Sequence, residues 1–292
     1  MTDRPGLPAP IASVPDLPAA AGPPLRAGVF QCAAGGLDPA ARLARLDEVL
    51  AERTLDLLLC PELFLSGYDV GDALIERAEP LGGPFMAAVA ALARRHGTAV
   101  AYGYPERDGG RLYNSAACLD AEGRLLANHR KLAIPPGFET RYFVPGDRPT
   151  LFRLGGLTCA LLVCYDAEFP ETVRWAAQAG AEAALVPTAL VERWRNVAFQ
   201  VMPTRAFESG LWLLYANHAG TEGDSRYLGA SCILAPDGSE AARAGAEETV
   251  IEAALHAGPV VAARDRIPYA EDARGLQRVL AAGGPDLQEG VA

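Results

Sequence analysis

The sequence is almost devoid of lysine. Of its 26 basic residues, Lys131 is the only lysine, and every other one is an arginine. Arginine carries a planar, permanently charged guanidinium, whereas lysine ends in a compact ammonium that fits a tight pocket. A chain that uses arginine for nearly all its cations therefore predicts a specific role for the ammonium of Lys131. The alternative is a surface lysine that has survived by chance.

Metal-binding patterns are also absent. The chain has six cysteines and four histidines, with no Cys-x-x-Cys pair and no histidine spaced to complete a zinc site. Most of the cysteines lie in apolar, strand-like runs, and we interpret all but Cys164 as reduced core residues of a cytoplasmic protein. We therefore expect no metal and no cofactor.

Basic clusters and a membrane-targeting start are missing too. A formal net charge of −10 without any local Lys/Arg cluster argues against a nucleic-acid partner. Residues 1–24 are rich in proline and alanine, with no basic start before an apolar run, so they predict a disordered tail and neither a signal peptide nor a membrane span. Residues 25–292, without repeat or linker, suit one large domain.

Strands and amphipathic helices alternate along the chain, which predicts an α/β fold. The apolar run from Leu25 to Cys32 is followed by Asp38-Pro39, an N-cap residue and a first-turn proline. Gly83-Pro84 opens a second helix, which is expected to end at His96-Gly97. Residues 192–209 predict one long helix with a kink at Pro203.

Cys164 marks the end of a buried strand. The run Leu161 to Val163 is apolar enough for a strand covered on both faces, and Pro170 suits the first turn of a helix. Cys164 is therefore expected at a strand-to-helix elbow, where its sulfur can be presented at a sheet edge and the amide of Tyr165 can point at whatever the sulfur attacks. The alternative is an inert core cysteine.

Two other charged residues follow predicted strands. Glu62 comes just after the apolar run Leu55 to Cys60, where partial desolvation would raise the carboxyl pKa towards the range of a general base. Lys131 ends the second strand of a hairpin, which also predicts a mixed sheet. A thiol needs a base, and the oxyanion that it generates needs a cation, so Glu62, Lys131 and Cys164 have complementary roles.

Four segments carry a resemblance to a known family. They are Pro61-Glu62-Leu63-Phe64-Leu65-Ser66-Gly67-Tyr68, Arg130-Lys131-Leu132, Cys164-Tyr165-Asp166-Ala167-Glu168-Phe169-Pro170-Glu171 and Arg205-Ala206-Phe207-Glu208. From about Leu25 onwards the chain resembles the nitrilase (carbon-nitrogen hydrolase) superfamily, and most of all its aliphatic amidases of the 5-aminopentanamidase type. The resemblance implies a four-layer α-β-β-α sandwich that forms a homodimer or a higher homo-oligomer.

The resemblance also implies roles for individual residues. Cys164 would be the nucleophile, Glu62 the general base, Lys131 the oxyanion stabiliser beside the Tyr165 amide, and Glu139 a second glutamate that orients Lys131 or the substrate nitrogen. The side chains expected around the substrate are Tyr68, Tyr165, Glu168 and Trp194.

Glu168 has two interpretations. Relatives that hydrolyse N-carbamoyl amino acids tend to carry an arginine at this position, so a carboxylate here would repel acidic substrates and favour an amine tail. The alternative is a purely structural network between Glu168 and Arg174.

The expected activity is hydrolysis of a small aliphatic primary amide, with water, to a carboxylate and ammonia through a cysteine thioester. The nearest alternatives are hydrolysis of an N-carbamoyl amine or amino acid, or of a nitrile. From another class, the chain could be a non-catalytic binding protein on the same fold. A papain-like Cys-His hydrolase would require His129 or His218 beside Cys164.

Overall fold

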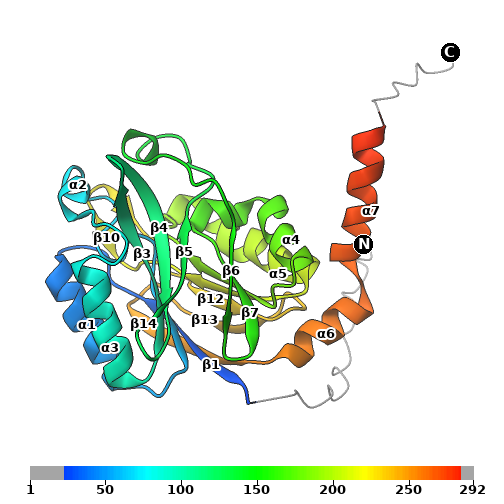
Figure 1. The fold of residues 1–292 in the computed structure, drawn as a ribbon, viewed down its shortest axis with the longest axis horizontal. Helices are drawn as coiled ribbons and strands as arrows, with labels where there is room; N and C mark the ends of the chain where they lie inside the picture. Colours follow the sequence, from blue (N-terminus) through cyan, green and yellow to red (C-terminus); the bar gives the residue numbers. More distant parts are fainter. Residues whose placement is uncertain (1–22, 284–292) are drawn as a thin grey trace, which may run out of the picture.

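The computed structural model describes residues 23–283, whose centre is a pair of six-stranded mixed sheets (Figure 1). The tail expected at residues 1–24 lies outside the described residues, apart from Pro23 and Pro24. In order across the first sheet, the strands are β14 (Thr249–Leu255), β1 (Leu25–Gln31), β2 (Leu57–Leu59), β3 (Ala99–Asp108), β4 (Arg111–Leu119) and β5 (Leu125–Arg130). Those of the second are β13 (Glu240–Arg243), β12 (Cys232–Leu234), β9 (Trp212–Ala216), β8 (Ala183–Pro187), β7 (Leu157–Leu161) and β6 (Thr150–Leu154).

Helices cover the outer face of each sheet. The first sheet carries α1 (Pro39–Ala51) and α3 (Pro84–His96), and the second carries α4 (Pro170–Gln178) and α5 (Met202–Ser209), on the opposite side of the molecule in Figure 1. The layers therefore run helix, sheet, sheet, helix, which confirms the four-layer sandwich that the resemblance implied.

Alternating side chains explain why both faces of each sheet are buried. On β2, Leu57 and Leu59 point into the core between the sheets, while Leu58 packs against α1 and α3. On β8, Leu185 joins the core between the sheets and Val186 packs under the outer helices. Successive strand residues face opposite sides, so a continuous apolar run fits a strand covered twice. Burial of each of these leucine side chains contributes about 1.5–3 kcal/mol to the free energy of unfolding.

Both predicted helix starts and stops are confirmed. The Asp38 side chain accepts a hydrogen bond from the amide of Ala41 at 2.8 Å, which caps the free amino end of α1. Gly97 ends α3 in the left-handed conformation, with φ of 63°.

The strand directions bring distant segments to the same edge. Strands β1, β2 and β3 are parallel, and the hairpin β4–β5 returns β5 to the direction of β3. The mixed sheet expected from this hairpin is thus confirmed. Because β2 and β5 point the same way, Glu62 and Lys131, which follow them, leave the sheet on one side.

The long helix expected over residues 192–209 is confirmed as an unbroken helical stretch, but its hydrogen-bonding pattern changes along its length. The segment consists of a 3-10 turn (Glu192–Trp194), a π-helical stretch (Val197–Val201) and then α5. Pro203 lacks an N–H, so it cannot continue the ladder of hydrogen bonds into the preceding turn; it occupies the first turn of α5 instead.

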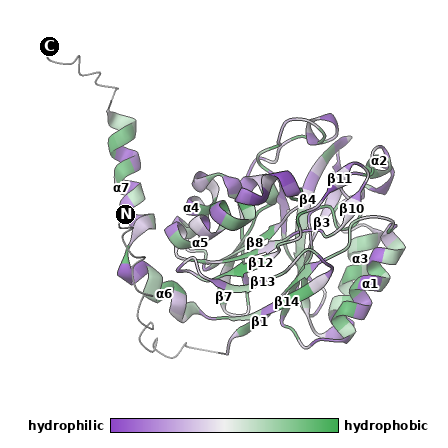
Figure 2. Cartoon of the chain, turned by 180° about the vertical axis from the view of Figure 1, so that it is seen from behind, coloured by the Kyte–Doolittle hydropathy of each residue, from purple (hydrophilic) through white to green (hydrophobic). Residues whose placement is uncertain are grey.

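Five further elements were not anticipated from the sequence: α2 (Ala73–Arg77), the two strands β10 (Thr221–Glu222) and β11 (Ser225–Arg226) of a small hairpin, α6 (Ala257–Arg266) and α7 (Tyr269–Ala282). Helix α7 extends away from the sandwich (Figures 1 and 2) and exposes Leu276, Val279 and Leu280 by 62%, 68% and 76%. Over residues 23–283, none of the helices combines the length and the apolar character that a membrane crossing needs.

Gly103 on β3 provides a test of how the loop after β2 is seated. A Cβ at Gly103 would stand 2.4 Å from the Leu63 nitrogen and 2.7 Å from the Glu62 Cα, both of them backbone atoms that cannot move aside alone. We expect Gly103→Ala to lower the free energy of unfolding by about 1–3 kcal/mol, measured by urea denaturation. Gly245→Ala, where nothing lies within 4 Å of the new methyl, is the control. Equal stabilities of the two variants would contradict this close packing.

Candidate active site

The structure brings Glu62, Lys131 and Glu139 together in one buried cluster. Glu62 follows β2, Lys131 directly follows β5, and Glu139 begins a 3-10 turn (Glu139–Arg141) in the long loop after it. The Lys131 Nζ donates to Glu62 Oε1 at 2.7 Å and to Glu139 Oε1 at 2.6 Å. None of the three side chains is more than 1% exposed. Three charges that are far apart in the sequence therefore form one ion-paired group.

Asn114 completes this cluster and was missed in the sequence. Its Nδ2 donates to Glu62 Oε1 at 2.7 Å and to Glu139 Oε2 at 3.0 Å, so it bridges the two carboxylates. Asn114 lies on β4, within an otherwise largely apolar strand. A buried amide needs hydrogen-bond partners, and this was the available signal that the strand passes a polar site.

One oxygen of Glu62 has no hydrogen-bond partner among residues 23–283. Glu62 Oε1 receives both donors, from Lys131 and Asn114, whereas Oε2 is buried and unpaired. Burial raises the pKa of Glu62 to about 7, against the opposing charge of Lys131 and with the help of Glu139. Glu62 thus has a free acceptor atom and a pKa suited to exchanging protons near neutrality.

Cys164 forms the predicted elbow beside this cluster. It follows β7 and begins a 3-10 turn (Cys164–Glu168), with a φ of 46° in the left-handed region that few non-glycine residues adopt. Burial and the charge of Glu62 raise the pKa of the thiol well above its usual range, while Lys131 and a hydrogen bond with Thr188 act in the opposite direction. The resting group is therefore a thiol, and it needs a base to become a nucleophile.

The other cysteines match the interpretation from sequence. They are buried and free of disulfides: Cys32, Cys60, Cys118, Cys159 and Cys232. Burial raises the pKa of the Cys60 and Cys118 thiols well above the usual range, which keeps them protonated and inert. The chemistry of the described residues thus centres on Cys164.

The charges of Glu139 and Glu62 keep Lys131 protonated. Burial alone would lower the pKa of an ammonium, but the two carboxylates outweigh it and raise the pKa of Lys131 well above its usual value. The cluster therefore presents a fixed positive charge beside the Cys164 sulfur. Such a cation can stabilise an oxyanion that forms when the sulfur attacks a carbonyl.

Asp166 links the elbow at Cys164 to the segment that follows Lys131. Its Oδ1 accepts from the amides of Leu132 and Ala133, both at 2.9 Å, and its Oδ2 accepts from the Val163 amide at 3.1 Å. Asp166 is fully buried, so these bonds act in a water-free environment. One side chain therefore fixes the segment before Cys164 relative to the segment after Lys131.

Both histidines considered as partners for Cys164 are engaged elsewhere. His129 Nε2 lies 3.0 Å from Asp166 Oδ2, and His218 Nε2 donates to the Glu62 carbonyl oxygen at 2.8 Å. Burial lowers the pKa of His218 to about 3, so its ring is neutral. Among the hydrogen bonds of residues 23–283, neither histidine contacts Cys164, which disfavours a papain-like pair.

The residues expected around the substrate lie at different depths. The Tyr68 hydroxyl donates to Glu139 Oε1 at 2.8 Å and so belongs to the buried cluster. The Tyr165 ring packs edge-on against Phe169, with 4.8 Å between ring centroids. Trp194, in the 3-10 turn Glu192–Trp194, is 56% exposed and lies beside Arg193.

Within residues 23–283, Glu168 and Arg174 form no direct ion pair, and Arg174 is linked to the Glu168 backbone through Glu208 and Arg205. Arg174 pairs instead with Glu208 at 3.0 Å, because Glu208 on α5 faces α4 across the helix pair. Glu168 ends the turn that begins at Cys164, and its backbone oxygen accepts from Arg205 at 2.6 Å. Burial raises the pKa of the Glu168 carboxyl group, and the positive charges of Lys131 and Arg205 oppose this.

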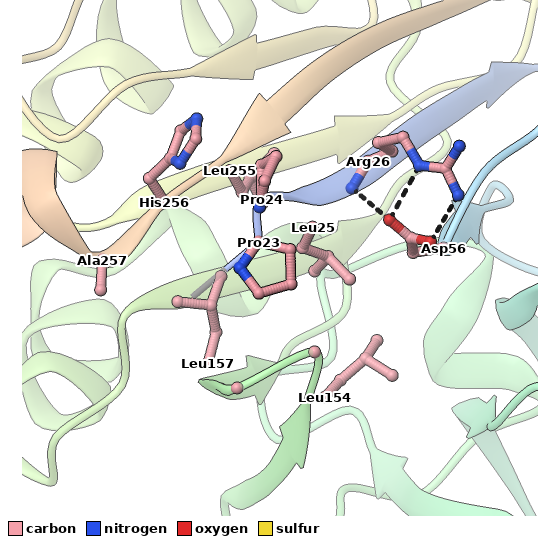
Figure 3. Close-up of a pocket in the computed structure, with 12 residues that line it drawn as sticks. Pro23, Pro24, Leu25, Arg26, Asp56, Leu154, Leu157, Leu255, His256 and Ala257 are labelled. Atoms are coloured by element: carbon pink, nitrogen blue, oxygen red, sulfur yellow. Dashed lines mark hydrogen bonds and ion pairs between the residues drawn. The ribbon is translucent and has the colours of Figure 1, made fainter. Parts of the chain in front are cut away.

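A cavity in the described part of the chain lies away from this cluster. It has a volume of about 780 Å³ and is lined by Pro23, Leu157, Leu255 and the ion pair of Arg26 with Asp56 (Figure 3). Apart from Leu255, which ends the antiparallel strand β14, these residues lie at the amino ends of β1, β2 and β7, whereas Cys164 and Glu62 follow the carboxyl ends of β7 and β2. This cavity therefore plays no part in the cluster.

The cluster is suited to acyl transfer. It combines a thiol, an adjacent carboxylate with a free oxygen and a buried cation, which are the groups needed to attack a carbonyl and hold the resulting oxyanion. Across the described residues, no group of three or more His, Cys, Asp or Glu side chains is arranged to hold a metal ion.

Several known proteins are similar to this chain in sequence and fold. A hydrolase in the pqqF 5′ region of Pseudomonas protegens is 40% identical over 98% of both chains. An (R)-stereoselective amidase of a Pseudomonas species is 35% identical over 75% of this chain and 80% of its own. A mutant of the amidase from Nesterenkonia sp. AN1, solved in complex with butyramide, superposes with a TM-score of 0.78 at 32% identity, covering 88% of this chain and 97% of the other.

The family model for carbon-nitrogen hydrolases matches residues 26–265, nearly all of the sandwich. It agrees with the resemblance carried by the segments around Glu62, Lys131 and Cys164 and with the four-layer fold. The chain therefore belongs to the carbon-nitrogen hydrolase family of the nitrilase superfamily.

Proposed function

We propose that this protein hydrolyses a small aliphatic primary amide to a carboxylate and ammonia through a thioester on Cys164. The observation that carries the proposal is the unpaired, buried Oε2 of Glu62, in a cluster that also places Lys131 beside the Cys164 thiol. The butyramide bound to the related Nesterenkonia amidase, a small primary amide, supports this substrate class.

The first half of the reaction forms the thioester. Glu62 accepts the proton of Cys164 as the sulfur attacks the amide carbon, and the carbonyl electrons move to oxygen. Lys131 and the Tyr165 amide stabilise that oxyanion. When the tetrahedral intermediate collapses, the carbon–nitrogen bond breaks, and Glu62 returns the proton to the departing nitrogen, which leaves as ammonia.

The second half regenerates the enzyme. Glu62 accepts a proton from water as the water oxygen attacks the thioester carbon, and Lys131 again stabilises the oxyanion. Collapse breaks the carbon–sulfur bond, the carboxylic acid leaves, and Glu62 returns a proton to the sulfur. Glu62 thus acts as base and acid in both halves, which its pKa of about 7 favours.

Glu139 positions the reacting groups together with the residues expected around the substrate, which are Tyr68, Tyr165, Glu168 and Trp194. Glu139 holds the Lys131 ammonium, and Tyr68 holds Glu139 in turn. We assign Tyr165 and Trp194 to the walls of the substrate site. Glu168 joins the network of Arg174, Glu208 and Arg205 through its backbone oxygen, and its carboxylate would favour a substrate with an amine tail.

The choice of substrate can be tested with a panel of primary amides that carry cationic, neutral and anionic tails. Ammonia release from at least one of them is expected. Release of carbon dioxide together with ammonia would identify an N-carbamoyl substrate, and turnover of nitriles alone would identify a nitrilase. No turnover of any of these compounds, with an unreactive Cys164, would favour a binding protein.

Replacing the sulfur tests the nucleophile. Cys164→Ala removes the group that forms the thioester, so we expect turnover of the best amide to fall by about 10⁴-fold or more. The measurement is the rate of ammonia release together with the thermal unfolding midpoint. Cys232→Ala, at a buried cysteine outside the cluster, serves as the control and is expected to keep activity. An active Cys164→Ala variant would refute the mechanism.

The pH dependence tests the base. Because the pKa of Glu62 is raised to about 7, its carboxyl group is protonated below that pH and cannot accept the thiol proton. We therefore expect kcat/KM to fall as the pH is lowered through about 7. The negative charge of Glu139 raises the pKa of Glu62, so Glu139→Gln should move this acid limb to lower pH as well as lower the maximum rate. An acid limb that stays in place or moves to higher pH contradicts the assignment.

We also propose that the protein self-associates through helix α7. Leu276, Val279 and Leu280 share one face of α7 and are exposed, as expected for a surface that a second copy covers. We expect analytical ultracentrifugation to detect a dimer or larger homo-oligomer. Leu280→Asp should weaken the association, and a wild-type protein that sediments as a monomer at micromolar concentration would exclude it.

A further inference from the structure

The loop that carries Tyr68 is clamped by a carboxylate from a distant part of the chain. Glu222 on β10 accepts two consecutive backbone amides at the same oxygen, Oε2, from Tyr68 at 2.7 Å and from Asp69 at 2.9 Å. The Tyr227 hydroxyl donates to this oxygen as well, at 3.3 Å. Glu222 is only 8% exposed, so these bonds are largely shielded from water.

A buried arginine balances the charge of Glu222 at its other carboxylate oxygen, Oε1. Arg42 on α1 is fully buried and donates to Glu222 Oε1 at 3.2 Å and to the Ala34 oxygen at 2.6 Å. Every group that contacts the Glu222 carboxylate therefore donates a hydrogen bond to it. An amide in its place would turn its NH₂ group towards donors on one side or the other.

Gly67 shows how closely the loop approaches Glu222. A Cβ at Gly67 would stand 2.4 Å from Glu222 Oε1, and the φ of Gly67 is +82°. Only glycine tolerates both conditions without strain. On the outer side, Asp69 Oδ2 accepts from the Asp224 amide at 3.1 Å and from Ser225 Oγ at 2.9 Å. The loop and the hairpin β10–β11 are thus joined at two points.

The same hairpin region also supports the loop near Glu62. The Tyr227 ring packs against the His218 ring, with 5.2 Å between centroids, and His218 Nε2 donates to the Glu62 backbone oxygen at 2.8 Å. The loop from Glu62 to Tyr68 is therefore fixed at both ends, near the Glu62 side chain and near the Tyr68 side chain.

We propose that Glu222 is a positioning residue that acts through Tyr68 on the Lys131 ammonium. Glu222 fixes the Tyr68 backbone, the Tyr68 hydroxyl reaches Glu139 Oε1, and the same oxygen accepts Lys131 Nζ at 2.6 Å. Loss of the clamp frees the Tyr68 ring, Glu139 loses one of its donors, and the ammonium shifts away from the position of the oxyanion. This inference rests on the proposed function, because its activity assay measures amide hydrolysis.

The test compares Glu222→Gln, Tyr68→Phe and the double variant. A displacement of about 1 Å in a positioning group can cost on the order of 10²-fold in rate, so we expect Glu222→Gln to lower kcat by about 10- to 100-fold with little change in KM. Because both substitutions break one chain of contacts, the double variant should be no slower than the slower single variant. Wild-type rates for Glu222→Gln, or losses that multiply in the double variant, would overturn the proposal.

A matched control lies on the same hairpin. Arg226 on β11 makes an exposed ion pair with Glu192 at 3.3 Å and has no contact with Glu222 or Tyr68 among the described hydrogen bonds. Arg226→Gln should keep kcat within about twofold, since exposed ion pairs contribute little. A comparable loss in Arg226→Gln would show that the hairpin matters only for general stability and would overturn the specific role of Glu222.

Two further measurements keep the proposal testable. If Glu222→Gln does not fold, Asp69→Asn loosens the outer clamp without disturbing the buried carboxylate, and its loss of kcat should likewise not add to that of Tyr68→Phe. The rate of Cys164 alkylation by iodoacetamide, followed by peptide mass spectrometry across pH, needs no substrate. A wild-type protein that is alkylated normally but releases no ammonia would refute the proposed function alone, whereas identical alkylation profiles of Glu222→Gln and wild type would refute this inference alone.

Discussion

The structure depends on one constraint, the burial of the Lys131 ammonium. A cation taken out of water costs several kcal/mol unless it is paired and hydrogen-bonded, and removal of one partner of a buried pair typically costs about 3–5 kcal/mol. Lys131 meets this requirement with two carboxylates, Glu62 and Glu139, from two different loops. The ion-paired cluster therefore fixes those loops in the folded state. The same contacts leave one oxygen of Glu62 free for proton transfer.

The sandwich provides the rigid frame for this cluster. Strands β2 and β5 run in the same direction and deliver Glu62 and Lys131 to one edge, while the second sheet delivers Cys164. The backbone is strained at Cys164, which has a φ of 46°, and at Leu63, the neighbour of Glu62, which has a φ of 49°. Asp166 holds the strained elbow to the segment that follows Lys131, and the packing of Gly103 against Glu62 seats the loop after β2.

Much of this could be predicted from sequence because strand ends and helix caps are local signals. The continuous apolar runs before Glu62 and Cys164, and the cap at Asp38, each depend on neighbouring residues alone. Asn114, Asp166 and Glu222 were not singled out, because each acts on a segment far away in the sequence that only the folded chain brings near. The helical stretch over residues 192–209 was predicted, but its π-helical part was not, because apolar spacing gives no sign of a change from π-helical to α-helical hydrogen bonding. Helices α6 and α7 were missed although Leu276, Val279 and Leu280 share one face of α7; α7 buries no residue and α6 buries only Val260, so neither helix is needed to cover the core.

The central claim is that the sulfur of Cys164 carries the acyl group while Lys131 and Glu62 stand beside it. Intact-protein mass spectrometry of the wild-type enzyme, mixed with butyramide and quenched in acid within the first turnovers, tests this directly. The account predicts a transient mass increase of one butyryl group, which peptide mapping assigns to Cys164. Ammonia release without any covalent adduct, or an adduct on another residue, would contradict it.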